Sequence, residues 1–168
     1  MIPKTLVLIR HAKSDWTSFD IKDFDRTLND RGLRDAPIMG KKLQQQIQSL
    51  DKIISSTAKR ASQTALLISK EIEYHPEKIQ WEDDLYHAPP ELIYNTIFQI
   101  NDDINSCAIV CHNNGITDFI NQFNGFVIDN LPTCGIVIFT IHCDKWNEIP
   151  TAKKELVAVL TPKNITLS

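Results

Sequence analysis

Glycine is scarce in this chain of 168 residues, which contains only five. They are Gly32, Gly40, Gly115, Gly125 and Gly135. Their spacing spells neither G-x-G-x-x-G nor G-x-x-x-x-G-K-[ST], the two patterns whose backbone N–H groups cradle nucleotide phosphates. The sequence therefore excludes nucleotide-binding loops of these two kinds.

Long hydrophobic runs are also missing. The apolar run near the N-terminus covers only residues 6–9 and stops at Arg10-His11. A membrane-spanning helix needs about 20 apolar residues, and the core of a signal peptide needs about 7–15. We therefore expect a cytoplasmic protein that has no membrane partner.

The chain has no excess of positive charge. It carries 18 Lys and Arg against 21 Asp and Glu, a formal net charge of −3. A dedicated nucleic-acid-binding domain would have a pI above about 9, so we expect no nucleic-acid partner, although a small basic pocket remains compatible. The length, together with a hydrophobic fraction of 42%, predicts a single folded domain over residues 1–168.

The chain has an even number of cysteines, and its sequence shows no export signal. The four residues are Cys107, Cys111, Cys134 and Cys143. Disulfides belong to exported proteins, so we expect free buried thiols. The spacing from Cys107 to Cys111 and His112 permits zinc. However, Cys107 lies in an apolar strand, where cysteine packs as a small hydrophobic residue, and we expect neither a metal nor a cofactor.

Short buried strands alternate with helical segments over most of the chain. Strands are expected at residues 5–9, 52–55, 78–81, 107–111, 135–141 and 155–160, and helices at 30–50, 58–72, 90–100 and 116–123. This alternation predicts an α/β fold, a three-layer α/β/α sandwich with a mostly parallel sheet. The last two strands are separated only by a turn at 144–148, so the sheet is expected to be mixed. Residues 13–29 form a polar stretch with the length of a functional loop.

Two histidines occupy matching positions in this pattern. His11 directly follows the first buried strand, and His112 follows the strand that ends at residue 111. Ligands of open α/β sheets bind beyond the carboxyl ends of the strands, so both rings reach the same rim if these strands are parallel neighbours. Arg10 adjoins His11, and Arg60 lies just inside the helix after the second strand. Each residue alone suits a surface or core role, but the set predicts a cationic pocket, because the arginine fork binds phosphate bidentately.

Five segments, in the same order, resemble the histidine phosphatase superfamily. Leu6-Val-Leu-Ile-Arg-His-Ala-Lys-Ser-Asp-Trp16 resembles its apolar strand followed by Arg-His-Gly or Arg-His-Ala, with the continuation of the short SixA-type phosphohistidine phosphatases. Residues 25–32 resemble the D-R-x-L-x-x-x-G segment of that branch, and residues 55–65 resemble S-S-x-A-x-R-A-x-Q-T-A. Residues 85–88 resemble L-Y-x-A, and residues 110–115 resemble V-G-H-N-x-G. The resemblance covers most of the chain.

The resemblance implies a role for each matched residue. His11 would be the nucleophile that becomes phosphohistidine, and Arg10, Arg60 and His112 would be catalytic residues that hold the phosphoryl oxygens. Ser14, just past the first motif, is a further candidate for a substrate contact. The implied fold is that of the phosphoglycerate mutase-like enzymes without a large cap insertion. No metal is needed, because preorganised guanidinium groups stabilise the charge of the transferring phosphoryl group.

The general acid and the substrate stay open. Larger superfamily members use a Glu or Asp to protonate the leaving group, and here Glu82, Asp83, Asp84, His87 and Asp15 lie near the motifs without matching an acid position. An imidazole leaving group can depart neutral and needs an acid less than an alkoxide does. This difference favours phosphohistidine in a phosphorylated protein as the substrate. The alternatives are a small-molecule phosphomonoesterase and a non-catalytic phosphate-binding regulatory module.

One residue departs from the family pattern inside a motif. Cys111 stands where the family usually has glycine, directly before His112. Its side chain either shifts the histidine loop or points into the core, and we expect the second arrangement. A thiol near the pocket also raises the hypothesis that the enzyme is sensitive to oxidation.

Overall fold

The computed structural model describes residues 2–16, 19–125 and 127–165. The strands are β1 (Lys4–Arg10), β2 (Lys52–Ser55), β3 (Gln80–Trp81), β4 (Ser106–Cys111), β5 (Ile136–His142) and β6 (Lys153–Leu160). The helices are α1 (Asp30–Gln46), α2 (Lys59–Glu71), α3 (Pro90–Phe98), α4 (Gly115–Asn124) and α5 (Pro162–Ile165). All the strands and helices expected from the sequence are therefore present, and α5 is an addition.

The six strands form one mixed sheet. Their order is β3-β2-β4-β1-β5-β6. Strand β4 runs parallel to β1 and β2, and β3 runs parallel to β2. Strand β5 runs antiparallel to both β1 and β6. The predicted mostly parallel sheet with a closing antiparallel pair is thus confirmed.

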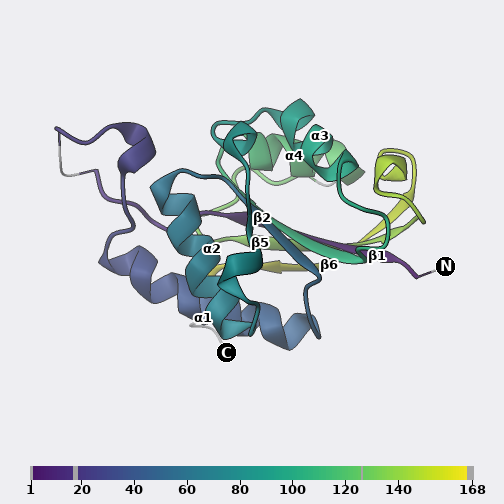
Figure 1. The fold of residues 1–168 in the computed structure, drawn as a ribbon, viewed down its shortest axis with the longest axis horizontal. Helices are drawn as coiled ribbons and strands as arrows, with labels where there is room; N and C mark the ends of the chain where they lie inside the picture. Colours follow the sequence, from purple (N-terminus) through teal and green to yellow (C-terminus); the bar gives the residue numbers. More distant parts are fainter. Residues whose placement is uncertain (1, 17–18, 126, 166–168) are drawn as a thin grey trace.

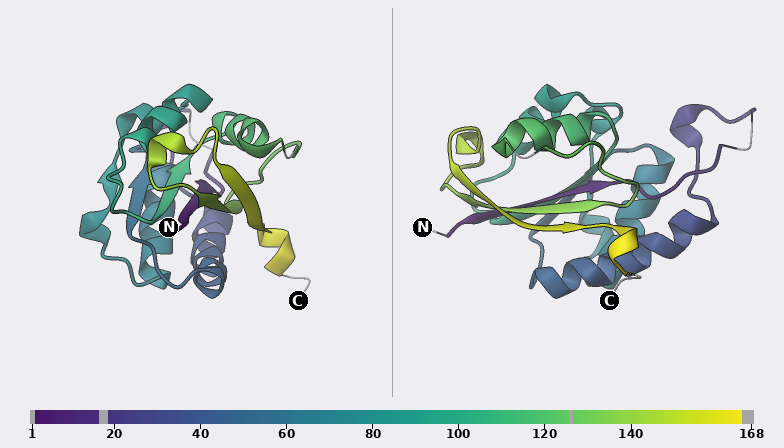
Figure 2. Two further views of the ribbon diagram at one scale, coloured as in Figure 1. Left: turned by 90° about the vertical axis from the view of Figure 1, so that its right-hand side faces the viewer. Right: turned by 180° about the vertical axis from the view of Figure 1, so that it is seen from behind.

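Helices cover both faces of the sheet. Helices α3 and α4 lie on one face, and α1 and α2 lie on the other (Figures 1 and 2). Leu6 and Leu8 of β1 pack with α3 and α4, whereas Val7 and Ile9 pack with α1 and α2. A strand buried on both faces requires a continuous apolar run, which is the pattern of β1. The predicted α/β/α sandwich is confirmed.

Helix α1 begins as expected and ends early. The Asn29 side chain caps it by accepting a hydrogen bond from the Gly32 N–H at 2.9 Å. The helix continues through Pro37 and ends at Gln46, because Ile47 has extended backbone angles. The expected end at residue 50 is wrong, and the extended chain instead carries Leu50 into the core before β2.

Three further observations concern the cysteines, the helix lengths and the possible metal ligands. All four cysteines are free and buried. In the described part of the chain, no helix is both long and apolar enough to cross a membrane. The same residues contain no group of three or more His, Cys, Asp or Glu side chains that could hold a metal ion.

Candidate active site

The two histidines that follow buried strands lie side by side at one edge of the sheet. Strands β1 and β4 are parallel neighbours with Arg10 opposite Cys111, so His11 and His112 emerge at the same level. Their ring centroids are 5.1 Å apart. This is the carboxyl edge of the parallel strands, where ligands of α/β sheets bind.

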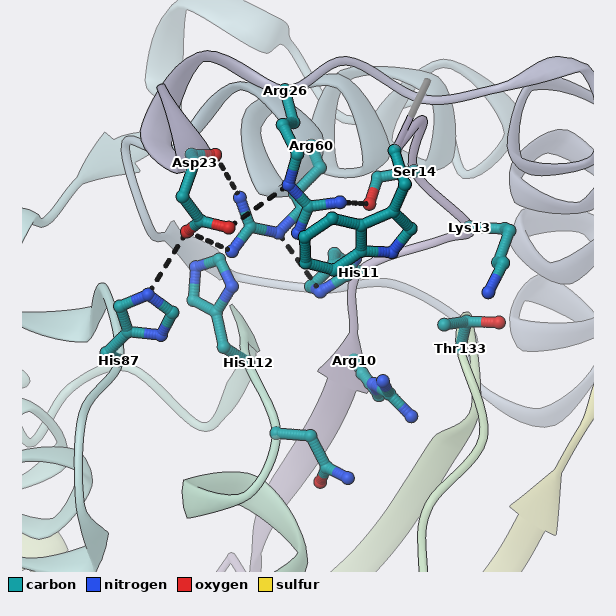
Figure 3. Close-up of a pocket in the computed structure, with 12 residues that line it drawn as sticks. Arg10, His11, Lys13, Ser14, Asp23, Arg26, Arg60, His87, His112 and Thr133 are labelled. Carbon is teal, nitrogen blue, oxygen red and sulfur yellow. Dashed lines mark hydrogen bonds and ion pairs between the residues drawn. The ribbon is translucent and has the colours of Figure 1, made fainter. Parts of the chain in front are cut away.

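A cavity of about 210 Å³ opens at this edge. All five residues that the sequence singles out line it, namely Arg10, His11, Ser14, Arg60 and His112 (Figure 3). The lining also includes Lys13, Arg26 and Asp23, which the sequence argument gave no role. Among the described residues, the cavity is thus lined by four permanent cations and one carboxylate, a balance that suits a multiply charged anion.

The His11 ring is held in one tautomer. Its Nδ1 lies 2.7 Å from the Ala12 carbonyl oxygen, which can only accept, so Nδ1 carries the proton and donates it. The other nitrogen, Nε2, is therefore unprotonated, and it accepts a hydrogen bond from Arg60 Nε–H at 3.4 Å. Burial, reinforced by the charges of Arg60 and Arg10, lowers the pKa of His11 to about 3, although the bond to Ala12 acts in the opposite direction. The imidazole is consequently unprotonated at neutral pH.

His112 presents a second polarised imidazole. Its Nε2 lies 2.8 Å from Ser56 Oγ. Its Nδ1 is buried and has no hydrogen-bond partner among the described residues. Burial, and then the nearby His11 and Arg60, lower the pKa of His112 to about 2. Buried polar atoms are normally paired, so Nδ1 is suited to a ligand oxygen when the Ser56 hydroxyl donates to Nε2.

Arg60, in the first turn of α2, is held by the loop between β1 and α1. Its Nη1 donates to the Asp23 carbonyl oxygen at 2.7 Å, and its Nη2 donates to Asp23 Oδ2 at 3.0 Å. Together with the contact to His11 Nε2, these bonds orient the guanidinium plane next to the His11 ring. The arginine fork is therefore held in one orientation by the protein itself.

Asp23 is the residue that connects this loop to the rest of the site. Its carboxylate pairs with Arg60 and Arg26, accepts the Tyr86 hydroxyl at 2.5 Å, and lies 3.1 Å from His87 Nε2. Partial burial raises the pKa of this carboxyl group, but the Tyr86 hydrogen bond and the two arginines outweigh it, so the pKa is lowered. Asp23 is therefore an ionised carboxylate and is unsuited to act as an acid. In the sequence, Asp23 is indicated only by its position in the polar stretch 13–29, just before the motif that contains Arg26.

Ser14 and Arg26 form a second polar contact in the cavity. Arg26 Nη1 donates to Ser14 Oγ at 2.6 Å, so the predicted substrate contact at Ser14 is occupied by a neighbouring arginine. The Arg26 guanidinium lies 3.4 Å from the centre of the Trp16 ring, in cation–π contact. Trp16 in turn is largely exposed, at 68%. The loop thus adds a fixed cation to the cavity lining.

Arg10 reaches the cavity from the end of β1. Its Nη1 donates to the Leu131 carbonyl oxygen at 2.8 Å, while its buried Nε has no hydrogen-bond partner among the described residues. Burial lowers the pKa of Arg10, although an arginine remains charged at neutral pH. Arg10 therefore provides an orphaned donor beside His11.

Of the five candidates for a general acid, His87 is the one found in the cavity lining when the described residues are considered. Asp83 instead accepts from the Thr57 hydroxyl, and Glu82 caps Asp84 in a short turn. The interpretation of residues 82–84 as a surface acidic turn agrees with these contacts.

Cys111 packs away from the cavity. Its side chain is buried in the core beneath α3 and α4, on the face that contains Leu6 and Leu8. Burial raises the pKa of its thiol to about 12. The residue that replaces the family's glycine therefore contributes to the core, and the protonated thiol is a poor nucleophile.

Known sequences match this chain over the part that contains the first strand and helix α2. The family model described as "Histidine phosphatase superfamily (branch 1)" matches residues 6–86, which include Arg10, His11 and Arg60. An uncharacterised protein of Mycobacterium leprae is 29% identical over 92% of this chain and 100% of the relative.

Solved structures share the complete fold. A SixA-type structure from Agrobacterium tumefaciens is 25% identical, has a TM-score of 0.77, and covers 95% of this chain and 99% of its own. A SixA-type structure from Nakamurella multipartitia is 23% identical, has a TM-score of 0.81, and covers 95% of this chain and 96% of its own. The chain therefore resembles the histidine phosphatase superfamily over residues 6–86, and its fold is that of the short SixA-type phosphohistidine phosphatases.

Proposed function

We propose that this chain is a metal-independent phosphatase that forms a phosphohistidine intermediate on His11 and dephosphorylates phosphohistidine in a protein. The observation that carries the proposal is the state of His11. Its Nδ1–H is bound to the Ala12 carbonyl group, and its unprotonated Nε2 faces the Arg60 guanidinium. A nucleophile must present an electron pair next to the groups that hold its target, and this arrangement does so.

The reaction has two steps. In the first, the electron pair of His11 Nε2 attacks phosphorus, and the bond from phosphorus to the leaving group breaks. Arg10, Arg60 and His112 hold the phosphoryl oxygens, and Arg26 adds positive charge at the same side of the cavity. In the second step, water attacks the phosphoryl group on His11, and the bond to Nε2 breaks. Fixed cations stabilise the charge spread over the equatorial oxygens in both steps.

The small size of the chain supports a protein substrate. The chain has the length of the SixA-type structures, which it covers almost completely, without a large inserted cap. A phosphohistidine presented on the surface of a partner protein can therefore approach an uncapped cavity. The cytoplasmic location, the single domain and the lack of a nucleic-acid partner stay predictions from the sequence.

A small-molecule phosphomonoesterase is the second candidate function. The observation that favours it is the presence of His87 in the cavity lining, because monoesters with alkoxide leaving groups need a proton donor. The preference for phosphohistidine that is expected from the sequence presupposes a cavity without an acid, and the position of His87 weakens it. A binding module is the third candidate, and it would have no need of an unprotonated nucleophile.

The test compares substrates and intermediates. Purified protein is assayed for phosphate release from a phosphohistidine-containing protein and from a panel of phosphate monoesters. The phosphoenzyme is sought by quenching, and it should be labile to acid, stable to base and absent from His11→Ala. His75→Ala, at an exposed histidine outside the cavity, is the matched control and should retain full activity.

Each other outcome has a clear meaning. Turnover by His11→Ala at the wild-type rate would refute the nucleophile. Binding of orthophosphate without turnover of any substrate would instead support the binding module.

A further inference from the structure

His87 has a conformation and an environment that its surface exposure does not explain. It lies in the turn before α3, and its backbone φ is 54°, in the left-handed region that non-glycine residues rarely adopt. Its ring lines the cavity beside His112, with the two ring centroids 5.7 Å apart. An exposed histidine that keeps an unfavourable backbone conformation while facing a cavity points to a role in that cavity.

Two contacts hold the His87 ring in place. Its Nε2 lies 3.1 Å from Asp23 Oδ2, and its ring lies 4.1 Å from the Tyr86 ring, measured between centroids. Because the Asp23 carboxylate is ionised and only accepts, His87 Nε2 must carry a proton in this contact. In Figure 3 the other nitrogen of the ring lies on the side turned toward His112.

The three cavity histidines lie in a row. His112 stands between the other two, with centroids 5.1 Å from His11 and 5.7 Å from His87 (Figure 3). In phosphoryl transfer the nucleophile and the leaving group lie roughly in line on opposite sides of phosphorus. A phosphoryl group held over His112 would thus have His11 on one side and His87 on the other.

We propose that His87 is the proton donor to the leaving group, that Asp23 is its positioning residue, and that the substrates include alkyl phosphate monoesters. The proposal rests on the proposed function, because it describes the group that leaves while His11 attacks. It extends the substrate class beyond phosphohistidine, since an alkoxide is a strong base whose departure needs a proton.

The proton and electron pairs balance over the two steps. Imidazolium His87 starts with protons on both nitrogens, one of them bound to Asp23. As His11 Nε2 bonds to phosphorus, the electron pair of the breaking P–O bond moves to the alkoxide oxygen, which takes the Nδ1 proton. Neutral His87 then accepts a proton from the attacking water. The P–N bond breaks with its electron pair returning to His11, and phosphate leaves with His87 protonated again.

The experiment replaces His87 with residues that tolerate its backbone conformation. Asparagine and glycine are the residues that most readily adopt a positive φ, so His87→Asn and His87→Gly keep the turn. Wild type and both variants are assayed with p-nitrophenyl phosphate, whose leaving group needs no proton, and with an alkyl phosphate such as glycerol phosphate. His75→Asn is the control at an exposed histidine.

We expect a loss that depends on the leaving group. His87→Asn should lower kcat/KM for the alkyl phosphate by about 100-fold or more and change that for p-nitrophenyl phosphate by less than about threefold. Added imidazole should restore part of the alkyl phosphatase activity of His87→Gly. Asp23→Asn should also lower kcat/KM for the alkyl phosphate more than kcat/KM for p-nitrophenyl phosphate. A general rise in KM would affect both substrates alike.

The outcomes that overturn the proposal are separate from those that overturn the proposed function. An equal loss with both substrates would make His87 a structural residue. A wild-type enzyme that forms the phosphoenzyme from p-nitrophenyl phosphate but does not hydrolyse the alkyl phosphate would reject the substrate class. In both cases His11 would remain the nucleophile, whereas absence of the phosphoenzyme would refute the proposed function itself.

Discussion

Burial of His11 and His112 makes the stability of the folded protein depend on pH in a predictable direction. His11 and His112 are 7% and 2% exposed, and the pKa of each is lowered in the folded protein to about 3 and about 2. In the unfolded chain both would titrate near 6.5. Between these values the unfolded chain binds protons that the folded protein excludes, so stability is full above about pH 6.5 and declines as the pH falls.

We therefore predict an acid loss of stability that begins well above the range of the carboxyl groups. Each of the two histidines should contribute about 2 kcal/mol to the decrease in unfolding free energy between pH 7 and pH 5. Urea denaturation at the two pH values measures this decrease. At pH 5 the lowered pKa of Asp23 keeps its carboxyl group ionised, so it contributes little to the difference.

A double variant, His11→Asn with His112→Asn, isolates this contribution. Its unfolding free energy should change much less with pH than that of wild type, whatever its absolute stability. His75→Asn, at an exposed site, should keep the wild-type pH dependence. If the double variant and wild type lose the same free energy on acidification, the buried imidazoles are not the cause.

The guanidinium of Arg60 does more than supply a positive charge. It donates from Nε, Nη1 and Nη2 to His11 and Asp23, in three fixed directions. A lysine ammonium group cannot reproduce this planar fork. Arg60→Lys should therefore lower kcat/KM by roughly 100- to 1,000-fold, comparable to the loss of a main oxyanion donor.

The control for this substitution is the same exchange at a surface position. Arg34 is exposed, with 67% of its side chain accessible, and Arg34→Lys should leave kcat/KM unchanged. Thermal unfolding of both variants shows whether either has lost its fold. A fully active Arg60→Lys enzyme would mean that net charge, and not the fork, holds the phosphoryl group.

Two glycines allow the elements of the site to approach closely. A Cβ atom on Gly32, in the first turn of α1, would lie 2.2 Å from the Lys13 carbonyl oxygen of the loop after β1. A Cβ atom on Gly115, the first residue of α4, would lie 1.7 Å from the Ala88 carbonyl oxygen before α3. Both contacts are far below van der Waals distance, so only glycine fits at these joints. The scarce glycines thus position the two motif loops.

Gly115→Ala should separate the beginning of α4 from the turn that contains His87. Overpacking against a backbone atom costs about 1–3 kcal/mol, and the displaced turn should also reduce activity. Denaturant unfolding together with kcat/KM measures both effects. Gly125→Asn is the control, because Gly125 meets no atom within 4 Å and asparagine tolerates its φ of 72°. Equal stability of the two variants would show that the joint relaxes without cost.

The elements of the fold were largely predictable, and the loop between β1 and α1 was not. Apolar runs such as residues 5–9 and the periodic stripe of α1 are local patterns, which sequence reasoning can read directly. Asp23 contacts Arg60, 37 residues away, and Tyr86, 63 residues away, in a segment without periodicity. Such contacts depend on the tertiary fold. For the same reason, the sequence could place His11 and His112 through strand ends but could not choose His87 among the acid candidates.

At the scale of the whole molecule, charge is distributed unevenly. The chain has a formal net charge of −3, whereas its cavity is lined by Arg10, Lys13, Arg26 and Arg60 against the carboxylate of Asp23. A phosphate dianion is repelled weakly by the distant charges and attracted strongly by those within a few ångströms. Local charge should therefore govern binding, despite the acidic balance of the whole chain.

Salt dependence distinguishes local from global charge. Inhibition by orthophosphate should weaken several-fold between about 0.02 M and about 0.5 M salt, since exposed charges are screened over a Debye length that shrinks to a few ångströms.

Arg26→Gln and Lys153→Gln each make the net charge more negative by the same amount. Arg26 lines the cavity, which lies at the carboxyl end of β1. Lys153 lies at the opposite edge of the sheet, because it pairs with His142, next to the residue that pairs with Lys4 at the amino end of β1. Arg26→Gln should weaken inhibition and flatten its salt dependence, while Lys153→Gln should leave both unchanged. Equal effects of the two variants would mean that the net charge of the molecule controls phosphate binding, because that is the one property they alter alike.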